Sequence, residues 1–206
     1  FFLIGPMTSG GIATNRGIII GAELFSETAS SPLDELNTWE KSVIRPIEKI
    51  PLVVAHELIH FQQHFQKDPE TLLERSIAEG SADFLSEIIA GAQINELQHS
   101  YGEQHEHALW NEFREVMNER DLSPWLYNGS EVAAGESADE RPGDMGYYIG
   151  YKICQSYYEN APDKKRAIKD IIEIEDFNQF LKESHYELRL ATSGVPTTPP
   201  QNQSHQ

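Results

Sequence analysis

Cationic side chains are scarce in this sequence. Only 16 Lys and Arg stand against 33 Asp and Glu in 206 residues, which gives a formal net charge of −17. Phosphate binding depends on clustered cations, and the sequence offers no comparable cluster. The composition therefore argues against a nucleic-acid partner and against adsorption to an anionic membrane surface. Solubility alone accounts for the acidity.

Cysteine and long apolar runs are also lacking. The single cysteine, Cys154, excludes an internal disulfide and lies in an apolar, aromatic run typical of a small buried hydrophobe. No apolar run is long enough to span a bilayer. The chain begins Phe1-Phe2-Leu3-Ile4, which resembles the middle of a strand. We therefore expect a truncated N-terminus, with any signal peptide or lipid anchor upstream.

The residue pattern predicts one mostly helical α+β domain over residues 1–188, followed by a disordered tail over 189–206. β-Branched and aromatic residues predict strands at 1–5 and 17–22, and the glycine-containing segment between them suits a turn or an edge strand. Helices are expected from about residue 39 and over 52–65, 69–90, 103–119, 144–160, 163–173 and 176–184. Asp68 and Pro69 indicate the start of the third of these helices, and Gly91 indicates its end.

The pattern His56-Glu57-Leu58-Ile59-His60 lies in an apolar stretch of a predicted helix. Residues four apart share one face of a helix, so both imidazoles can bind one ion. Burying these polar groups without partners costs several kcal/mol, which a metal ion would offset. The sequence therefore predicts a zinc site with Glu57 as the base that activates water. A pair of hydrogen-bonded core histidines is the alternative.

A third protein ligand is needed for a catalytic zinc site. His64 continues the four-residue spacing, but it lies about 12 Å from His56 along a straight helix. The longer metzincin pattern fails as well, because Gln63 and Gln66 occupy its glycine and last histidine positions. We therefore expect His64 to be a surface residue.

Glu79 is the better candidate for the third ligand. Glu79 and Asp83 are four residues apart on the next predicted helix, and Gly80 between them allows close backbone approach. If this helix packs against the first, Glu79 can reach the ion. Asp83 can then accept a hydrogen bond from a liganding histidine. A solvated acidic helix face is the alternative interpretation.

These motifs resemble a known arrangement. H-E-x-x-H, eighteen intervening residues and Glu79 in an E-x-x-x-D context resemble the gluzincins, as in thermolysin-like and aminopeptidase-type metalloproteases. Beyond the motifs, the stretches 4–23, 54–84 and 141–151 resemble the bacterial zinc-dependent proteases grouped as a domain of unknown function. The chain is also similar to lipoproteins of gliding motility, in which the zinc motif is not reliably present. The resemblance implies a gluzincin-like domain with a small N-terminal sheet on the H-E-x-x-H helix.

A peptidase also needs a donor for the oxyanion that forms on the attacked carbonyl. Tyr147 and Tyr151 share a predicted helix face, and the family similarity places their segment near the metal. Either hydroxyl could serve, although aromatic stripes more often belong to a core; Arg141 is a further candidate. Residues 10–13 suit either a glycine turn or an edge strand along which a peptide adds.

Three further histidines, His99, His105 and His107, surround Tyr101-Gly102. A second metal site there is conceivable, but a solvated loop and helix start is the more typical reading of this composition. The helical spacing of Trp110, Phe113, Val116 and Met117 predicts core residues.

The sequence thus predicts a zinc metallopeptidase with Zn²⁺ as its cofactor and a peptide or protein as its substrate. The alternative is a non-catalytic binding or structural protein, stabilised by the metal and related to the motility lipoproteins. The frequent export of the family implies a periplasmic, secreted or lipid-anchored protein. The cleaved bond and the oligomeric state do not follow from the sequence.

Overall fold

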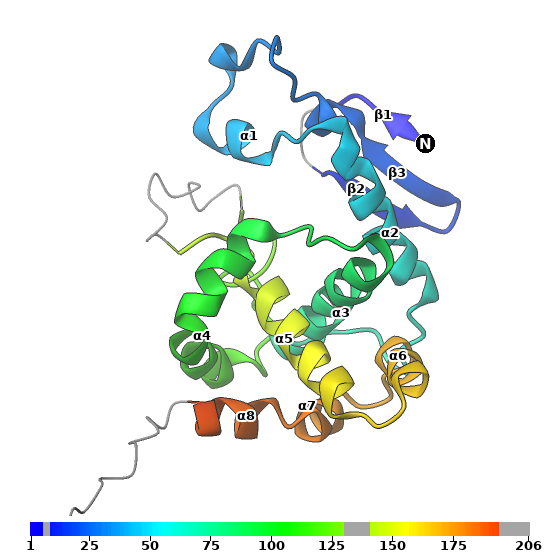
Figure 1. Cartoon of the computed structure of the whole chain (residues 1–206), viewed down its shortest axis with the longest axis vertical. Coiled ribbons are helices and arrows are strands. Elements are labelled where there is room, and N and C mark those ends of the chain that lie inside the picture. The colour runs from blue at the N-terminus through cyan, green and yellow to red at the C-terminus, as the bar shows by residue number, and fades with distance from the viewer. Residues whose placement is uncertain (6–8, 130–140, 194–206) are drawn as a thin grey trace, which may run out of the picture.

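The computed structural model describes residues 1–5, 9–129 and 141–193. Its N-terminal part forms a small sheet of three strands, β1 (Phe2–Leu3), β2 (Gly11–Thr14) and β3 (Gly17–Gly21) (Figure 1). The strand order is β1-β3-β2, with β1 parallel and β2 antiparallel to β3. β2 is therefore an edge strand, one of the two options that the sequence left open for residues 10–13.

Helices make up most of the remaining chain, which confirms the mostly helical α+β fold. They are α1 (Thr38–Val43), α2 (Ile50–Gln62), α3 (Leu72–Ala90), α4 (Glu96–Val116), α5 (Met145–Asn160), α6 (Lys164–Ile172), α7 (Phe177–Ser184) and α8 (Tyr186–Ser193). Short 3₁₀ turns cover 22–25, 33–35 and 47–49. Within the described part of the chain, no helix combines the length and apolarity needed to cross a membrane.

The sheet packs on α2, as expected. A small apolar cluster joins them, with Val53 of α2 against Ile20, Leu24 and Phe25. At Gly11, β2 approaches α2 so closely that a Cβ atom would lie 2.6 Å from Val53 Cγ1. A larger residue at this position would displace the side chains of Val53 and Glu57. The sheet is thereby fixed against the helix that carries the two motif histidines.

Helices α3 and α5 cross each other (Figure 1), and glycines lie at their contact. A Cβ atom on Gly80 would overlap the backbone of Gly150 and Tyr151, and one on Gly150 would overlap the carbonyl oxygen of Ser76. The absence of side chains lets the two backbones touch at this crossing. The contact fixes the rotation of α3 about its axis, with Glu79 directly beside it.

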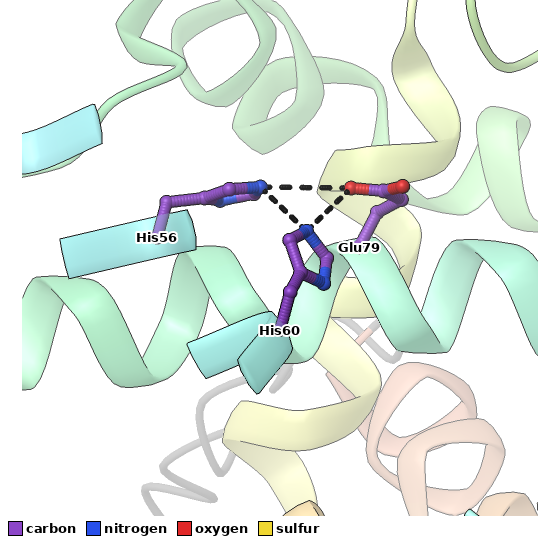
Figure 2. A group of neighbouring side chains, drawn as sticks. All are labelled: His56, His60 and Glu79. Carbon is purple, nitrogen blue, oxygen red and sulfur yellow. Dashed lines mark hydrogen bonds and ion pairs between the residues drawn. The ribbon is translucent and has the colours of Figure 1, made fainter. Parts of the chain in front are cut away.

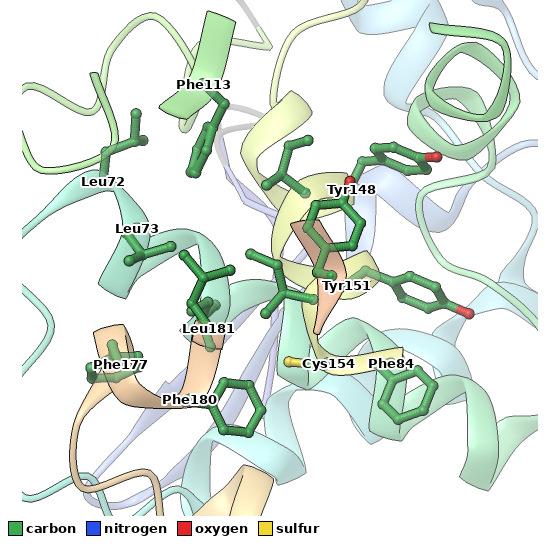
Figure 3. Close-up of a cluster of buried hydrophobic side chains, with 14 of the residues drawn as sticks. Leu72, Leu73, Phe84, Phe113, Tyr148, Tyr151, Cys154, Phe177, Phe180 and Leu181 are labelled. Carbon is green, nitrogen blue, oxygen red and sulfur yellow. The ribbon is translucent and has the colours of Figure 1, made fainter. Parts of the chain in front are cut away.

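The main core surrounds this crossing (Figure 3). Buried side chains from α3, α4, α5 and α7 meet there, among them Leu72, Leu73, Phe113, Tyr148, Phe177 and Phe180. Cys154 is fully buried, and Trp110 and Phe113 lie in the core, as the sequence predicted.

The start of α3 differs from the prediction. The helix begins at Leu72, after the expected cap Asp68 and the expected first residue Pro69. Thr71 is the N-cap instead, because its hydroxyl accepts the N–H of Glu74 while the Glu74 carboxylate accepts the N–H of Thr71. This reciprocal pair satisfies two free backbone donors, which the Asp-Pro signal three residues earlier does not.

Helix α4 begins seven residues before the predicted start at residue 103. Gly102 and its polar neighbours suggested a loop, but Gly102 lies inside the helix. A Cβ atom there would come within 2.6 Å of the Tyr148 ring, so glycine is required for close packing on α5. The predicted end of α3 at Gly91 is confirmed, with Gly91 in the left-handed conformation at φ 75°.

Helical structure extends into the first residues of the predicted tail. Helix α8 continues to Ser193, so the tail expected over 189–206 begins with helical residues. Tyr186 and Leu190 anchor this helix, with exposed fractions of 0% and 5%. The rest of the predicted tail, 194–206, lies outside the described residues.

Candidate metal centre

Three side chains from α2 and α3 converge on one point (Figure 2). His56 Nε2 lies 3.0 Å from His60 Nε2, and Glu79 Oε2 lies 3.6 Å from the first nitrogen and 3.3 Å from the second. Both histidines come from successive turns of α2, which the sequence spacing anticipates. Glu79 reaches them because α3 packs along α2.

The spacing of these three atoms matches the geometry of a bound zinc ion. Zinc bonds to nitrogen and oxygen are about 2.0–2.1 Å, so tetrahedral ligand atoms lie roughly 3.3–3.4 Å apart. The three observed separations bracket that value. Two imidazoles and one carboxylate are also a donor set that zinc favours. In the described residues, His56, His60 and Glu79 form the one group of His, Cys, Asp or Glu side chains able to share an ion.

The orientation of His56 is fixed by Asp83. His56 Nδ1 donates to Asp83 Oδ1 at 2.7 Å, which leaves Nε2 directed at the other two residues. Asp83 Oδ2 accepts a second hydrogen bond from Asn95 Nδ2, at 2.6 Å. Asp83 is 3% exposed, so both contacts are shielded from water. Asp83 thus occupies the place that the E-x-x-x-D spacing indicated.

The orientation of His60 is fixed by Gln63. His60 Nδ1 donates to Gln63 Oε1 at 2.8 Å, and Gln63 Nε2 donates to Ala78 O and Ser81 Oγ on α3. Gln63 therefore couples the end of α2 to α3 as well as orienting the histidine. The sequence reasoning used Gln63 only to reject the metzincin pattern. Its position three residues after His60, on the same helix face, was the signal available.

Glu79 has a partner of its own. The hydroxyl of Tyr127 donates to Glu79 Oε1 at 2.6 Å, while Oε2 faces the histidines. Tyr127 lies in the segment between α4 and α5, 48 residues along the chain, and no sequence motif marks it. His56, His60 and Glu79 are thus each held by one further residue. The contact is made through the nitrogen or oxygen that does not face the other two side chains.

Glu57 lies on α2 beside the edge strand. It is 7% exposed, and the backbone N–H of Ala13 in β2 lies close enough to its carboxylate to lower its pKa. Burial raises the pKa of Glu57, and the charges of His56 and His60 offset only part of this effect. Gly11 gives Glu57 the space it occupies, because a Cβ atom there would lie 2.9 Å from Glu57 Oε1.

The three converging side chains shift one another's pKa values. Burial lowers the pKa of His56, but the hydrogen bonds and charges of Asp83 and Glu79 outweigh burial and raise it to about 10. For His60, the contacts with Glu79 likewise outweigh burial, and the pKa is raised. Burial raises the pKa of Glu79, but both histidines lower it further, to well below its usual range. The histidines and the carboxylate therefore favour one another's charged forms.

Zinc binding is expected to release at least one proton per ion at pH 8, because a liganding imidazole must be neutral. Since the pKa of His56 lies near 10, its metal-free form is protonated at pH 8, and the apparent zinc affinity should rise with pH up to that value. Calorimetric titrations in buffers of different ionisation enthalpy measure the release. The exposed His64→Ala variant serves as the control and should release the same number of protons; zinc uptake without proton release would contradict the expectation.

The two tyrosines predicted as oxyanion donors lie in different surroundings. The Tyr147 ring stacks beside the His56 ring, with centroids 6.4 Å apart. Burial and the charge of Glu79 raise the Tyr147 pKa well above its usual range, so the phenol stays protonated. The Tyr151 hydroxyl donates to Glu87 at 2.6 Å, in a hollow lined by α3 and α5. Of the two, the structure places Tyr147 next to the converging side chains.

The other candidates have structural contacts. Arg141 pairs with Glu112 and lies over the Trp125 ring. His99, expected in a solvated loop and helix start, is 4% exposed, with its ring against those of Tyr148 and Tyr151. The solvated interpretation is therefore wrong for His99, because α4 begins earlier than predicted.

The other histidines considered from the sequence lie at or near the surface. His105 stacks on Tyr101 and bonds to its carbonyl oxygen, whereas His64 and His107 are exposed. The surface position expected for His64 is confirmed.

Comparison with known proteins adds one finding. Residues 34–177, more than half of the chain, match the model of the family described as "Predicted Zn-dependent protease (DUF2268)". The chain belongs to this family. No curated protein and no solved structure matches it.

The family match spans every residue of the converging group and its supporting contacts. It includes α2, α3 and the Tyr127 segment, whereas the three-stranded sheet precedes it. The resemblance to zinc-dependent proteases of unknown function, expected from the motifs, is thereby confirmed.

Proposed function

We propose that this protein is a gluzincin-type zinc metallopeptidase that hydrolyses peptide bonds. The observation that carries the proposal is the convergence of His56 Nε2, His60 Nε2 and Glu79 Oε2 at 3.0–3.6 Å. These residues would hold the ion. A bound zinc ion supplies a Lewis acid that polarises a carbonyl group and makes water more acidic.

Glu57 supplies the base in this proposal. Its carboxylate takes the proton from the attacking water and later passes it to the leaving amine. Asp83 and Gln63 hold the two imidazoles in the tautomer that directs Nε2 inward. A structural metal site has no use for a neighbouring base, so Glu57 favours an enzyme over a metal-stabilised binding protein.

The number of ligands also favours an enzyme over a metal-stabilised binding protein. Structural zinc sites have four protein ligands, whereas catalytic sites have three and leave a position for water. In the described residues, the converging group contains three side chains. A fourth protein ligand would instead support the non-catalytic alternative, related to the motility lipoproteins.

The substrate in this proposal is an extended peptide. β2 is an edge strand next to Glu57, and an edge strand binds extended peptides through its backbone groups. A peptide added along Gly11–Thr14 would bring a carbonyl group close to α2. Tyr147, which lies beside His56, is the proposed donor to the oxyanion.

Incubation of the zinc-loaded protein with a diverse peptide library tests the proposal. We expect cleavage products, detected by mass spectrometry, that disappear after chelation and return with zinc. The His60→Ala variant should lose both zinc and activity, which separates the intrinsic reaction from a contaminating protease. A zinc-loaded protein that cleaves no peptide, or cleavage that persists in His60→Ala, would contradict the proposal.

A further inference from the structure

We infer that Tyr127 is a positioning residue that holds Glu79 so that only one carboxylate oxygen faces the metal. Its hydroxyl donates to Oε1 at 2.6 Å, and Oε2 lies within 3.6 Å of both histidine nitrogens. The inference rests on the proposed zinc site. It adds a residue from a separate segment, between α4 and α5, to the machinery on α2 and α3.

The segment around Tyr127 is firmly anchored. Its neighbours Trp125, Leu126 and Asn128 are 3%, 1% and 7% exposed. The N–H of Asn128 donates to Asp144 Oδ1 at 2.9 Å, and the N–H of Asp144 donates to Asn128 Oδ1 at 2.7 Å. These reciprocal bonds fix the segment to the start of α5. Tyr127 therefore projects from a rigid support.

Tyr127 itself adopts an unfavourable backbone conformation. Its φ angle is 59°, in the left-handed region that a bulky side chain rarely occupies. The side chain remains 56% exposed, so burial of the ring explains little of this conformation. This conformation brings the Tyr127 hydroxyl to Glu79, and it places the Tyr127 ring edge-on to Tyr147, with centroids 6.4 Å apart. Strained residues of this kind cluster at ligand-binding and active sites.

The phenol hydroxyl occupies one of the two carboxylate oxygens of Glu79, because it donates to Oε1 at 2.6 Å. With Oε1 occupied in this way, Glu79 offers one oxygen to an ion. A carboxylate that bound through both oxygens would take up the position that a water molecule needs.

Tyr127→Phe tests the inference with zinc and cobalt ions as probes. We expect the zinc affinity, measured by competition with a chromophoric chelator, to fall about tenfold, as for other residues that orient metal ligands. The visible absorption of the Co²⁺-loaded variant should weaken, because a carboxylate free to bind through both oxygens raises the coordination number. Both readouts are independent of turnover.

Tyr157→Phe is the matched control, because its hydroxyl also donates to a carboxylate, Asp170, but on the contact between α5 and α6. It should leave both metal readouts unchanged. Tyr127→Gly relieves the strained φ angle, so its metal-free thermal midpoint should equal or exceed that of the wild type while its zinc affinity falls as in Tyr127→Phe.

Two results would overturn the inference. One is a folded Tyr127→Phe protein with wild-type zinc affinity and Co²⁺ spectrum. The other is a Tyr127→Gly protein with a lowered metal-free midpoint and an unchanged Co²⁺ spectrum, which indicates a merely structural role. A wild-type protein that binds no zinc would overturn the proposed function together with this inference, whereas a missing peptidase activity alone would leave the positioning role intact.

Discussion

Replacing Glu57 with Gln should leave zinc bound and lower peptide turnover by about 10²- to 10⁴-fold, the usual contribution of a general base. The amide cannot accept the proton of the attacking water. It keeps the shape of the carboxylate, so the packing of α2 against β2 persists. The rate on a peptide cleaved by the wild type and the zinc content of the variant, measured on one preparation, check both halves of this expectation.

Glu48→Gln makes the matched control for this substitution. Glu48 is exposed in the turn just before α2, so the same loss of one charge occurs outside the site. Its turnover should stay within about twofold of the wild type, since surface substitutions of this kind have small effects. If the Glu57→Gln protein retained comparable activity with zinc bound, another group would have to serve as the base.

Replacing Gly150 with Ala should lower the free energy of unfolding by about 3 kcal/mol or more, at the upper end of overpacking effects. The new Cβ atom would overlap the carbonyl oxygen of Ser76, a backbone atom that cannot turn aside as a flexible side chain can. Helices α3 and α5 must then separate. Because Glu79 lies beside the crossing, zinc affinity should fall as well. Urea unfolding of the metal-free protein and zinc titration of the folded fraction measure the two effects.

Gly10→Ala controls for the general effect of replacing glycine. A Cβ atom there would make ordinary contacts of 3.8 Å with Phe25 and 3.9 Å with Leu24, so no displacement is needed. Its free energy of unfolding should change by less than about 1 kcal/mol. Equal stability of Gly150→Ala and Gly10→Ala would show that the α3–α5 crossing tolerates a methyl group.

The two histidines of the centre could be predicted from the sequence because their geometry is local. Residues four apart on a helix share a face whatever the rest of the fold does, and the apolar stretch indicated that this face is buried. Glu79 required one further step, the packing of a second helix. The spacing of Asp83 and the resemblance to gluzincins supported that step, and the structure brings Glu79 to both histidines.

The supporting contacts depend on tertiary packing that no local pattern records. Tyr127 reaches Glu79 across 48 residues of sequence, through a segment with no recognisable motif. Asn95 reaches Asp83 because α4 begins at Glu96, and the sequence predicted that start seven residues too late. The prediction was wrong at Gly102, because this glycine permits close packing against Tyr148 and does not mark a loop. Such glycines are ambiguous until the packing partner is known.

The edge strand β2 has one further consequence. Free edges of β-sheets invite pairing with other chains and so favour aggregation. Here the Ala13 N–H faces the carboxylate of Glu57, and the Gly11 carbonyl accepts a hydrogen bond from the Ser9 hydroxyl. Two of the backbone groups that another strand would use thus already face polar side-chain atoms. These contacts oppose pairing with a second copy of the chain, and an incoming peptide must displace them before it can pair.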